Sequence, residues 1–145
     1  MELADKVAIV TGGGSGIGAA LAQRFVREGA SGVVVADIGF EAALAVANAL
    51  GPRALAVRCD VSKEADIRSL VATTREHFGR VDIFMSNAGV LGTLGGIELE
   101  DALWTRMWEV HAMAHVWAAR AVIPEMLERG EGYFLITASA AGLLN

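Results

Sequence analysis

The sequence contains a single cysteine, Cys59, among its 145 residues. One thiol excludes both an internal disulfide framework and a zinc site built from cysteines. Cys59 falls in a segment whose pattern predicts a strand, so we expect a buried and inert thiol. His111 and His115 lie four residues apart, but no third ligand is evident near them, so we expect no metal site.

Long apolar runs and clusters of positive charge are also absent. No stretch approaches the roughly 20 uncharged apolar residues that a membrane-spanning helix needs. The formal net charge of −5 disfavours binding to nucleic acid. The first six residues are too polar for a signal peptide. We therefore expect a cytoplasmic protein that binds neither nucleic acid nor a membrane.

Hydrophobic residues nevertheless make up 54% of the chain. Such an excess is typical of a parallel sheet that is covered on both faces. It would equally suit a fragment whose partner surface is missing. The length is sufficient for one domain with a core of its own.

Apolar runs and helical patterns alternate along the chain. This alternation predicts an α/β fold with a doubly wound parallel sheet. We expect a Rossmann-like sheet with the strand order 3-2-1-4-5. In the first expected helix, Ile17, Leu21 and Phe25 recur every four residues, which predicts a stripe facing the sheet. Ser62 is the expected N-cap of the third helix. The expected strands are residues 7–11, 32–36, 54–59, 82–86 and 133–138, and the expected helices are residues 16–28, 40–50, 63–78 and 100–129.

A glycine-rich segment, residues 11–18, joins the first strand to the first helix. A helix start offers unpaired backbone N–H groups and a partial positive charge to an anion. Glycines let the backbone turn sharply and let a pyrophosphate come close. The segment therefore predicts a phosphate seat. Its candidate binding residues are Gly12, Ser15, Gly16, Ile17 and Gly18.

Asp37 ends the second apolar run, about 20 residues beyond the glycines, where an acid that holds a ribose is expected. A carboxylate there accepts hydrogen bonds from ribose hydroxyls and repels a 2′-phosphate, which favours NAD over NADP. The next residue, Ile38, is included in the expected site, and no positive charge follows it. An acidic cap after the strand is the alternative, and the spacing favours ribose binding.

Taken together, the motifs of this chain resemble those of the short-chain dehydrogenases/reductases. The resemblance implies an oxidoreductase that moves hydride between NAD and a small secondary alcohol or ketone. It also implies a homo-oligomer formed through the long helix. The matching segments are residues 11–18, Asp37, Cys59-Asp60-Val61, Ser86-Asn87-Ala88-Gly89, and residues 132–142 around Ser139.

The resemblance assigns roles to residues that follow the later strands. Asp60 would accept a hydrogen bond from the adenine amino group while Val61 packs against the ring. The alternative for Asp60 is an acid that favours a helix start. Asn87 would tie strand ends together, and Ala88 and Gly89 would leave room for the cofactor.

Ser139 matches the catalytic serine of the family. Its hydroxyl would donate to a carbonyl oxygen that gains negative charge as hydride reaches the carbon. Without the resemblance, a serine that caps the strand end would be an equal interpretation.

Two positions depart from the family pattern. Ser86 stands where the family usually carries the first of two asparagines. His111 stands where it usually carries an asparagine that holds a proton-relay water. An imidazole also binds water, so His111 is a candidate catalytic residue with a changed pKa. A histidine packed partly against the sheet is the alternative, and both stay open.

The family's general base is a tyrosine with a lysine four residues later, and this pair does not occur within the 145 residues. Tyr133 has no lysine at that offset. We expect residues 1–145 to be a single NAD(P)-binding domain, truncated before this pair and inactive by itself. A non-catalytic dinucleotide-binding or interaction module is the main alternative, and an NADP-dependent reductase is a weaker one.

Overall fold

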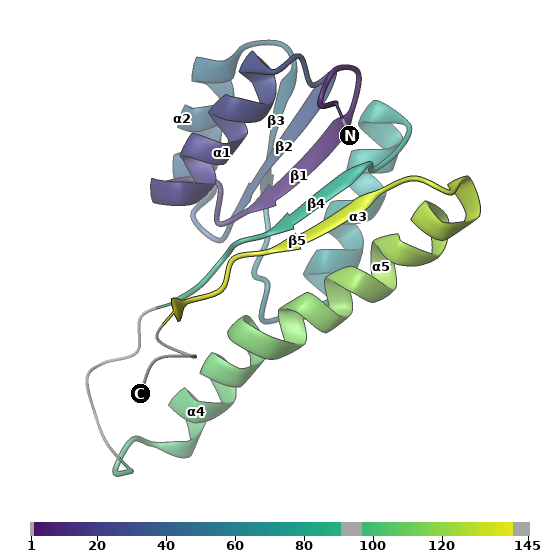
Figure 1. The fold of residues 1–145 in the computed structure, drawn as a ribbon. Coiled ribbons are helices and arrows are strands. Elements are labelled where there is room, and N and C mark those ends of the chain that lie inside the picture. The colour runs from purple at the N-terminus through teal and green to yellow at the C-terminus, as the bar shows by residue number, and fades with distance from the viewer. Residues whose placement is uncertain (1, 91–96, 141–145) are drawn as a thin grey trace.

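The structure is a computed structural model and describes residues 2–90 and 97–140. Within them, five parallel strands form one sheet in the order β3-β2-β1-β4-β5, which confirms the expected order (Figure 1). The strands are β1 (Val7–Thr11), β2 (Gly32–Asp37), β3 (Ala54–Arg58), β4 (Ile83–Ser86) and β5 (Tyr133–Ile136). The helices are α1 (Gly16–Arg27), α2 (Phe40–Leu50), α3 (Glu64–Phe78), α4 (Asp101–Trp108) and α5 (Ala114–Arg129).

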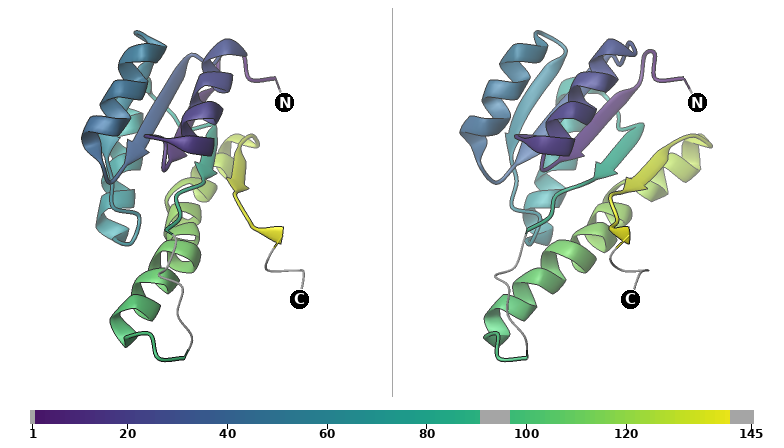
Figure 2. Two further views of the ribbon diagram at one scale, coloured as in Figure 1. Left: turned by 90° about the vertical axis from the view of Figure 1, so that its left-hand side faces the viewer. Right: turned by 60° about the vertical axis from the view of Figure 1, so that its left-hand side comes forward.

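Helices cover both faces of the sheet (Figure 2). Successive side chains of a strand point to opposite faces, so Ala8 and Val10 pack with α1 and α2, whereas Ile9 packs with α3 and α5. Phe25 of α1 anchors the first core and Leu70 of α3 the second. Because both faces of the sheet are buried, the central strands are continuous apolar runs.

Two local expectations about helix starts are wrong. Ile17 is 64% exposed, and the buried residues of α1 are Gly18, Ala22 and Phe25. The side chain of Ile17 lies at the rim of the cavity described below, where α1 begins, and not over the sheet. Ser62 is not the N-cap of α3, because its hydroxyl donates to Asp60 Oδ1 at 2.7 Å and Lys63 takes the capping position.

Three strands are shorter than expected. β5 ends at Ile136 instead of residue 138, β4 begins at Ile83 instead of residue 82, and β3 ends at Arg58 instead of residue 59. The backbone carbonyl of Asp82, just before β4, accepts the N–H of Tyr133, and the carboxylate of Asp82 accepts the N–H of Val7. Cys59 follows β3 and does not lie within it, but its side chain is buried, as expected.

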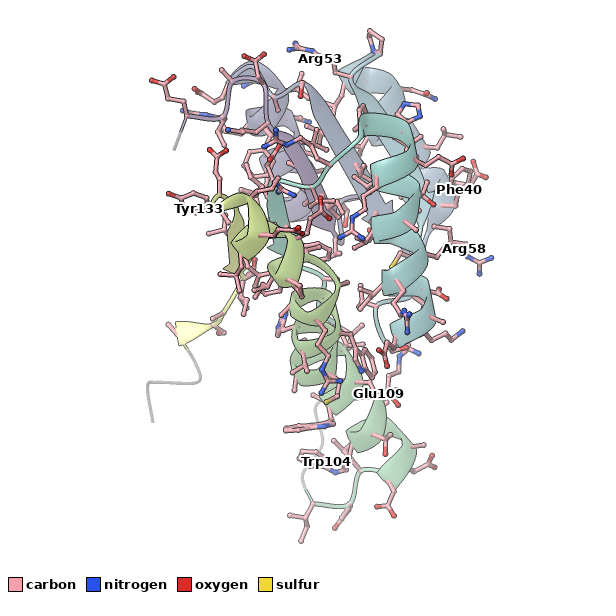
Figure 3. All side chains as sticks on the ribbon, turned by 90° about the vertical axis from the view of Figure 1, so that its right-hand side faces the viewer. Phe40, Arg53, Arg58, Trp104, Glu109 and Tyr133 are labelled. Atoms are coloured by element: carbon pink, nitrogen blue, oxygen red, sulfur yellow. The ribbon has the colours of Figure 1, made fainter. Side chains whose placement is uncertain are left out.

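The long helix expected over residues 100–129 is interrupted. A π-helical turn, Glu109–Met113, separates α4 from α5. α4 projects past the sheet and has no buried residue (Figure 1). Trp104 stands on this projecting part (Figure 3), and both Trp104 and Trp108 are exposed. Among the described residues, no helix is both long and apolar enough to cross a membrane.

Candidate functional site

A cavity of about 480 Å³ opens beyond the carboxyl ends of the strands. Every residue named above as a candidate site residue lines it, except Ser139. Residues from β1, β2, β3 and β4 are thereby brought together although they are far apart in the sequence. The lining consists of Gly12, Ser15, Gly16, Ile17, Gly18, Asp37, Ile38, Cys59, Asp60, Val61, Asn87, Ala88, Gly89, Val90, Arg106, Val110, His111 and Thr137.

The glycine-rich turn brings the start of α1 against β1. Gly12 has a φ of +64°, a conformation that side chains with a Cβ rarely adopt. A Cβ on Gly18 would overlap the carbonyl group of Gly12 and would come within 2.9 Å of Asn87 Nδ2. Only a residue without a side chain therefore allows this close approach at position 18.

The amino end of α1 is suited to an anion. Ser15 occupies the N-cap position but makes no side-chain capping bond, and the first turn contains no acidic residue. The first backbone N–H groups of a helix carry a partial positive charge and have no partner within the helix. A phosphate is the kind of group that such a helix end binds.

Asp37 is held at the end of β2 by the backbone. Its Oδ2 accepts a hydrogen bond from the N–H of Gly14, and its Oδ1 accepts one from the N–H of Gly39, each at 2.9 Å. A carboxylate offers about four acceptor sites. About two therefore remain for ligand hydroxyls, and the carboxylate is already oriented.

Asp60 is held in a similar way after β3. Its Oδ1 accepts hydrogen bonds from the backbone N–H and the hydroxyl of Ser62, at 3.1 and 2.7 Å. Burial alone would raise the pKa of this carboxyl, but the bonds from Ser62 and the charges of Lys63 and Arg106 lower the pKa below its ordinary value. Asp60 is therefore an anion at neutral pH. Its Oδ2 accepts neither bond from Ser62 and lies 3.6 Å from Lys63 Nζ.

The Cys59 thiol lies beneath this part of the cavity. Burial raises its pKa to about 12, and the neighbouring carboxylates of Asp66, Asp60 and Asp37 add to the shift. A thiol with such a pKa is protonated and a poor nucleophile. Cys59 therefore contributes to packing and does not act as a nucleophile.

A polar cluster joins the ends of three strands under the cavity. Asn87 Nδ2 donates to the carbonyl of Thr11 at 3.0 Å, and Thr137 Oγ1 donates to Asn87 Oδ1 at 2.8 Å. Thr11 Oγ1 accepts from the backbone N–H groups of Asn87 and Ala88. Asn87 therefore ties β1, β4 and β5 together, which is the structural task that its position after β4 predicted.

The family model described as "short chain dehydrogenase" matches residues 6–145. The chain belongs to the short-chain dehydrogenase family. Among curated relatives, 3beta-hydroxysteroid dehydrogenase 2 of Eggerthella lenta is 38% identical over 97% of this chain and 56% of its own length. The chain thus spans about half the length of the curated relatives it matches.

Solved structures of this family superpose closely on the fold. A 7 alpha-hydroxysteroid dehydrogenase complexed with NADH and 7-oxo glycochenodeoxycholic acid gives a TM-score of 0.92 at 35% identity, over 99% of this chain and 57% of that one. A 3-ketoacyl-(acyl-carrier-protein) reductase from Brucella melitensis complexed with NADH gives 0.90 at 37% identity, over 97% and 60%.

The two departures from the family pattern both make hydrogen bonds. His111 lies in the π-helical turn, and its Nε2 is 2.9 Å from the carbonyl oxygen of Val90 and 3.4 Å from its nitrogen. Ser86 Oγ lies 2.6 Å from His115 Nδ1. Burial lowers the pKa of His115, and the nearby His111 lowers it further. In the described residues, no three His, Cys, Asp or Glu side chains are grouped to hold a metal ion.

Sequence reasoning did not select five residues that line the cavity, namely Cys59, Val90, Arg106, Val110 and Thr137. Thr137 stands at a strand end that the fold rule singles out, and its pairing with Asn87 gives it a structural part. Arg106 lies on α4, away from any strand end. The only pattern that could have indicated its place in the cavity is its spacing of four residues from Val110. Ser139 is exposed and lies beyond β5, and its catalytic role stays a prediction.

Proposed function

We propose that residues 1–145 form the dinucleotide-binding domain of an oxidoreductase that transfers hydride between NAD and a secondary alcohol or ketone. The observation that carries this proposal is the gathering of an anion seat, two oriented carboxylates and a glycine-lined wall around one cavity at the strand ends. The hydride chemistry belongs to the nicotinamide. The protein binds the coenzyme, orients it and polarises the substrate.

The residues present fit such a coenzyme. The start of α1 would hold the pyrophosphate through backbone N–H groups of residues 16–18, and Gly18 allows the turn at Gly12 to lie directly against this helix start. Asp37 would accept hydrogen bonds from both ribose hydroxyls with the acceptor sites that Gly14 and Gly39 leave open. The same negative charge would oppose a 2′-phosphate, and this supports NAD over NADP.

Asp60 and Val61 would contact the adenine on the side of β3. Asp60 Oδ2 accepts no hydrogen bond from Ser62, and its exposed ion partner Lys63 lies 3.6 Å away, beyond hydrogen-bond distance, so a single amino donor could still approach this oxygen. Val61 is buried at the cavity wall and offers an apolar surface to a ring. Asn87, Ala88 and Gly89 would border the opposite half of the coenzyme.

Ser139 would donate its hydroxyl hydrogen to the substrate oxygen as negative charge develops there. Its position supports this role, because it lies two residues beyond Thr137, which lines the cavity. His111 would hold a water or hand on a proton through the ring nitrogen that does not contact Val90. The proton-transferring tyrosine and lysine of the family would come from sequence beyond these 145 residues.

Coenzyme titration tests this proposal on the natural full-length gene product. We expect NADH to bind at least about tenfold more tightly than NADPH, because Asp37 discriminates against the extra phosphate. Asp37→Ala should weaken NADH binding and reduce this preference, whereas Glu41→Ala, which removes an exposed acid nearby, should change neither. Tighter binding of NADPH by the unmodified protein would reverse the cofactor assignment, and binding of neither coenzyme would refute the proposal.

A non-catalytic dinucleotide-binding module is the second candidate. It is favoured by the contact of His111 Nε2 with the Val90 backbone, which occupies a nitrogen that a relay water would use. The discriminating measurement is turnover of NAD with a panel of secondary alcohols, hydroxysteroids included, since two of the matched relatives are named hydroxysteroid dehydrogenases. Coenzyme binding without oxidation of any alcohol would support the module.

We further propose that the protein forms a homo-oligomer through the long helix. The exposed Trp104 and Trp108 on α4 support this, since large aromatic side chains are enriched at interfaces. Sedimentation of the full-length protein should give more than one subunit, and Trp108→Glu should shift it toward the monomer. An unmodified protein that sediments as a monomer would contradict this assembly.

A further inference from the structure

Residues 86–90 form a short wall of the cavity between the end of β4 and the following loop. Asn87, Ala88, Gly89 and Val90 all line the cavity. Besides the bonds of Asn87 and Ala88 to Thr11, this segment makes two contacts with the long helix, one at each of its ends. His115 reaches Ser86 at one end, and His111 reaches Val90 at the other.

The contact at Ser86 joins a buried hydroxyl to a half-buried histidine in apolar surroundings. Ser86 is 4% exposed, and the neighbouring residues of β4 and α5, Phe84, Ala114 and Ala118, belong to one hydrophobic core. A hydroxyl in such a place requires a partner, because an unsatisfied buried polar group is costly. His115 Nδ1 at 2.6 Å is that partner, and it connects β4 directly to α5.

The contact at Val90 lies at the surface, where both His111 and Val90 are exposed. His111 lies in the π-helical turn, and a Cβ built on Gly89 would come within 3.1 Å of His111 Cε1. The imidazole therefore packs against the backbone of Gly89 while its Nε2 contacts Val90. Residues 86–90 are thus held between two histidines that lie one turn apart on the same helix.

The sheet order indicates which half of a dinucleotide this wall would meet. β2 and β3 lie on one side of β1, and β4 and β5 lie on the other. With the pyrophosphate at α1 and the adenosine ribose at Asp37, the adenine half extends over β2 and β3. The nicotinamide half then extends over β4, against residues 86–90.

We propose that His115 is a positioning residue: through Ser86, and together with the His111–Val90 contact, it holds residues 86–90 in place against the nicotinamide half of the coenzyme. This inference rests on the proposed function. Neither Ser86 nor His115 lines the cavity, so the effect passes through the backbone of the wall. The neutral imidazole that burial favours at His115 is able to share a proton with the Ser86 hydroxyl.

The test compares two ligands on the natural full-length gene product. ADP-ribose probes the adenine half and the pyrophosphate, and NADH adds the nicotinamide. We expect Ser86→Ala and His115→Phe each to weaken NADH binding about fivefold, the equilibrium effect of one net hydrogen bond, with ADP-ribose binding unchanged. The fluorescence emission of bound NADH should also shift, because it reports the surroundings of the nicotinamide ring.

Three further variants sharpen the test. The double variant, Ser86→Ala with His115→Phe, should bind NADH no more weakly than either single variant. Each single substitution already removes the one hydrogen bond that the two residues share. His115→Asn should retain binding, since its amide group lies where Nδ1 lies in the histidine. His77→Phe, the same substitution as His115→Phe at an exposed histidine of α3, should change nothing.

Equal weakening of ADP-ribose and NADH would overturn the proposal, because it would show a general loss of structure. Unchanged NADH binding and emission in both single variants would overturn it as well. If His115→Phe fails to fold, Ser86→Ala decides, since it removes one oxygen and adds no atom to the core. An unmodified protein that binds neither ligand would refute the proposed function itself, a result distinct from failure of this contact.

Discussion

The two rims of the same sheet use their polar groups in opposite ways. At the amino-end rim, Asp82 is fully buried, and its carboxylate accepts the N–H of Val7 at 2.9 Å and pairs with Arg80. Arg129 adds a second positive charge 3.6 Å from it. At the carboxyl-end rim, glycine turns, a helix start and oriented carboxylates surround a cavity. At the amino ends the charged groups pair with one another, whereas at the carboxyl ends Asp37 and Asp60 line a cavity.

Residues at the amino ends of the strands should therefore affect mainly the stability of the fold, and residues at the carboxyl ends mainly the binding of a ligand. A buried carboxylate that joins strands contributes mainly to the folded state. A helix start without a capping side chain and with exposed Ile17 contributes little to folding, but it offers donors to an anion. Variants at the two rims should therefore have separable effects, all measured on the natural full-length gene product.

Asp82→Ala should have the largest effect, and it should act on stability. Removing this carboxylate leaves the N–H of Val7 and two arginines without their buried acceptor. We expect the free energy of unfolding to fall by about 4 kcal/mol in urea denaturation. NADH binding by the folded protein should stay within about twofold of the original, given that independent sites act additively. A loss of binding without a loss of stability would contradict the separation of the rims.

Gly18→Ala should show the converse pattern. Its Cβ would overlap the carbonyl group of Gly12, so the turn that we propose as the pyrophosphate seat must shift. We expect NADH affinity to fall by about a hundredfold, since misplaced donors no longer meet a phosphate. Gln23→Ala, an exposed change on the same helix, is the control and should leave affinity unaltered. Retained affinity in Gly18→Ala would show that the coenzyme lies elsewhere.

Thr137→Val should have a smaller effect, shared between the two properties. It removes the hydrogen bond from Thr137 Oγ1 to Asn87 Oδ1 but keeps the shape of the side chain. We expect a loss of about 1 kcal/mol or less in the free energy of unfolding, and about a twofold weakening of NADH binding. Calorimetric titration and thermal melting measure the two effects. An unchanged protein in both assays would mean that Asn87 is held sufficiently by Thr11.

The smallest effect should be a pH-dependent one at the amino-end rim. A hydrogen bond from Lys6 lowers the pKa of Glu131 below its ordinary value, and the positive charge of Lys6 adds to this shift. Because the folded-state pKa lies below the unfolded-state value, the stabilisation is present above the ordinary value of 4.5 and is lost as the pH falls through the folded-state pKa.

Glu131→Gln should therefore lower the melting temperature slightly at pH 7. Its difference from the unmodified protein should disappear as the solution is acidified below the ordinary glutamate range. Glu76→Gln on α3 is the matched control for removal of an exposed carboxylate. A difference that grows on acidification would contradict the sign of this prediction.

Much of the carboxyl-end rim could be predicted from the sequence, because its parts are local. A glycine turn between a strand and a helix, and an acid after the next strand, are patterns of neighbouring residues. The parallel topology then requires that such strand ends meet. Of the expected stripe, Leu21 and Phe25 pack on the core but Ile17 does not. Ile17 and the Ser62 cap were wrong for a related reason, since periodicity does not show where a helix passes beyond the sheet or which acceptor a hydroxyl finds.

The contacts between distant segments could not be predicted in this way. Ser86 and His115 lie 29 residues apart, and neither residue alone indicates the other. Arg106 reaches the cavity from a helix that projects past the sheet, so no strand end marks it.

The sequence by itself determined the parallel α/β architecture, the two-sided core and the place of the cavity, because apolar periodicity and glycine turns act over a few residues and ligands of parallel sheets bind at the carboxyl ends of the strands. Only the tertiary structure decided how the cavity wall is held, which carboxylate oxygens remain available and which histidine contacts which strand. These outcomes depend on side chains that meet across the fold, where distances of a few tenths of an ångström decide whether a hydrogen bond forms.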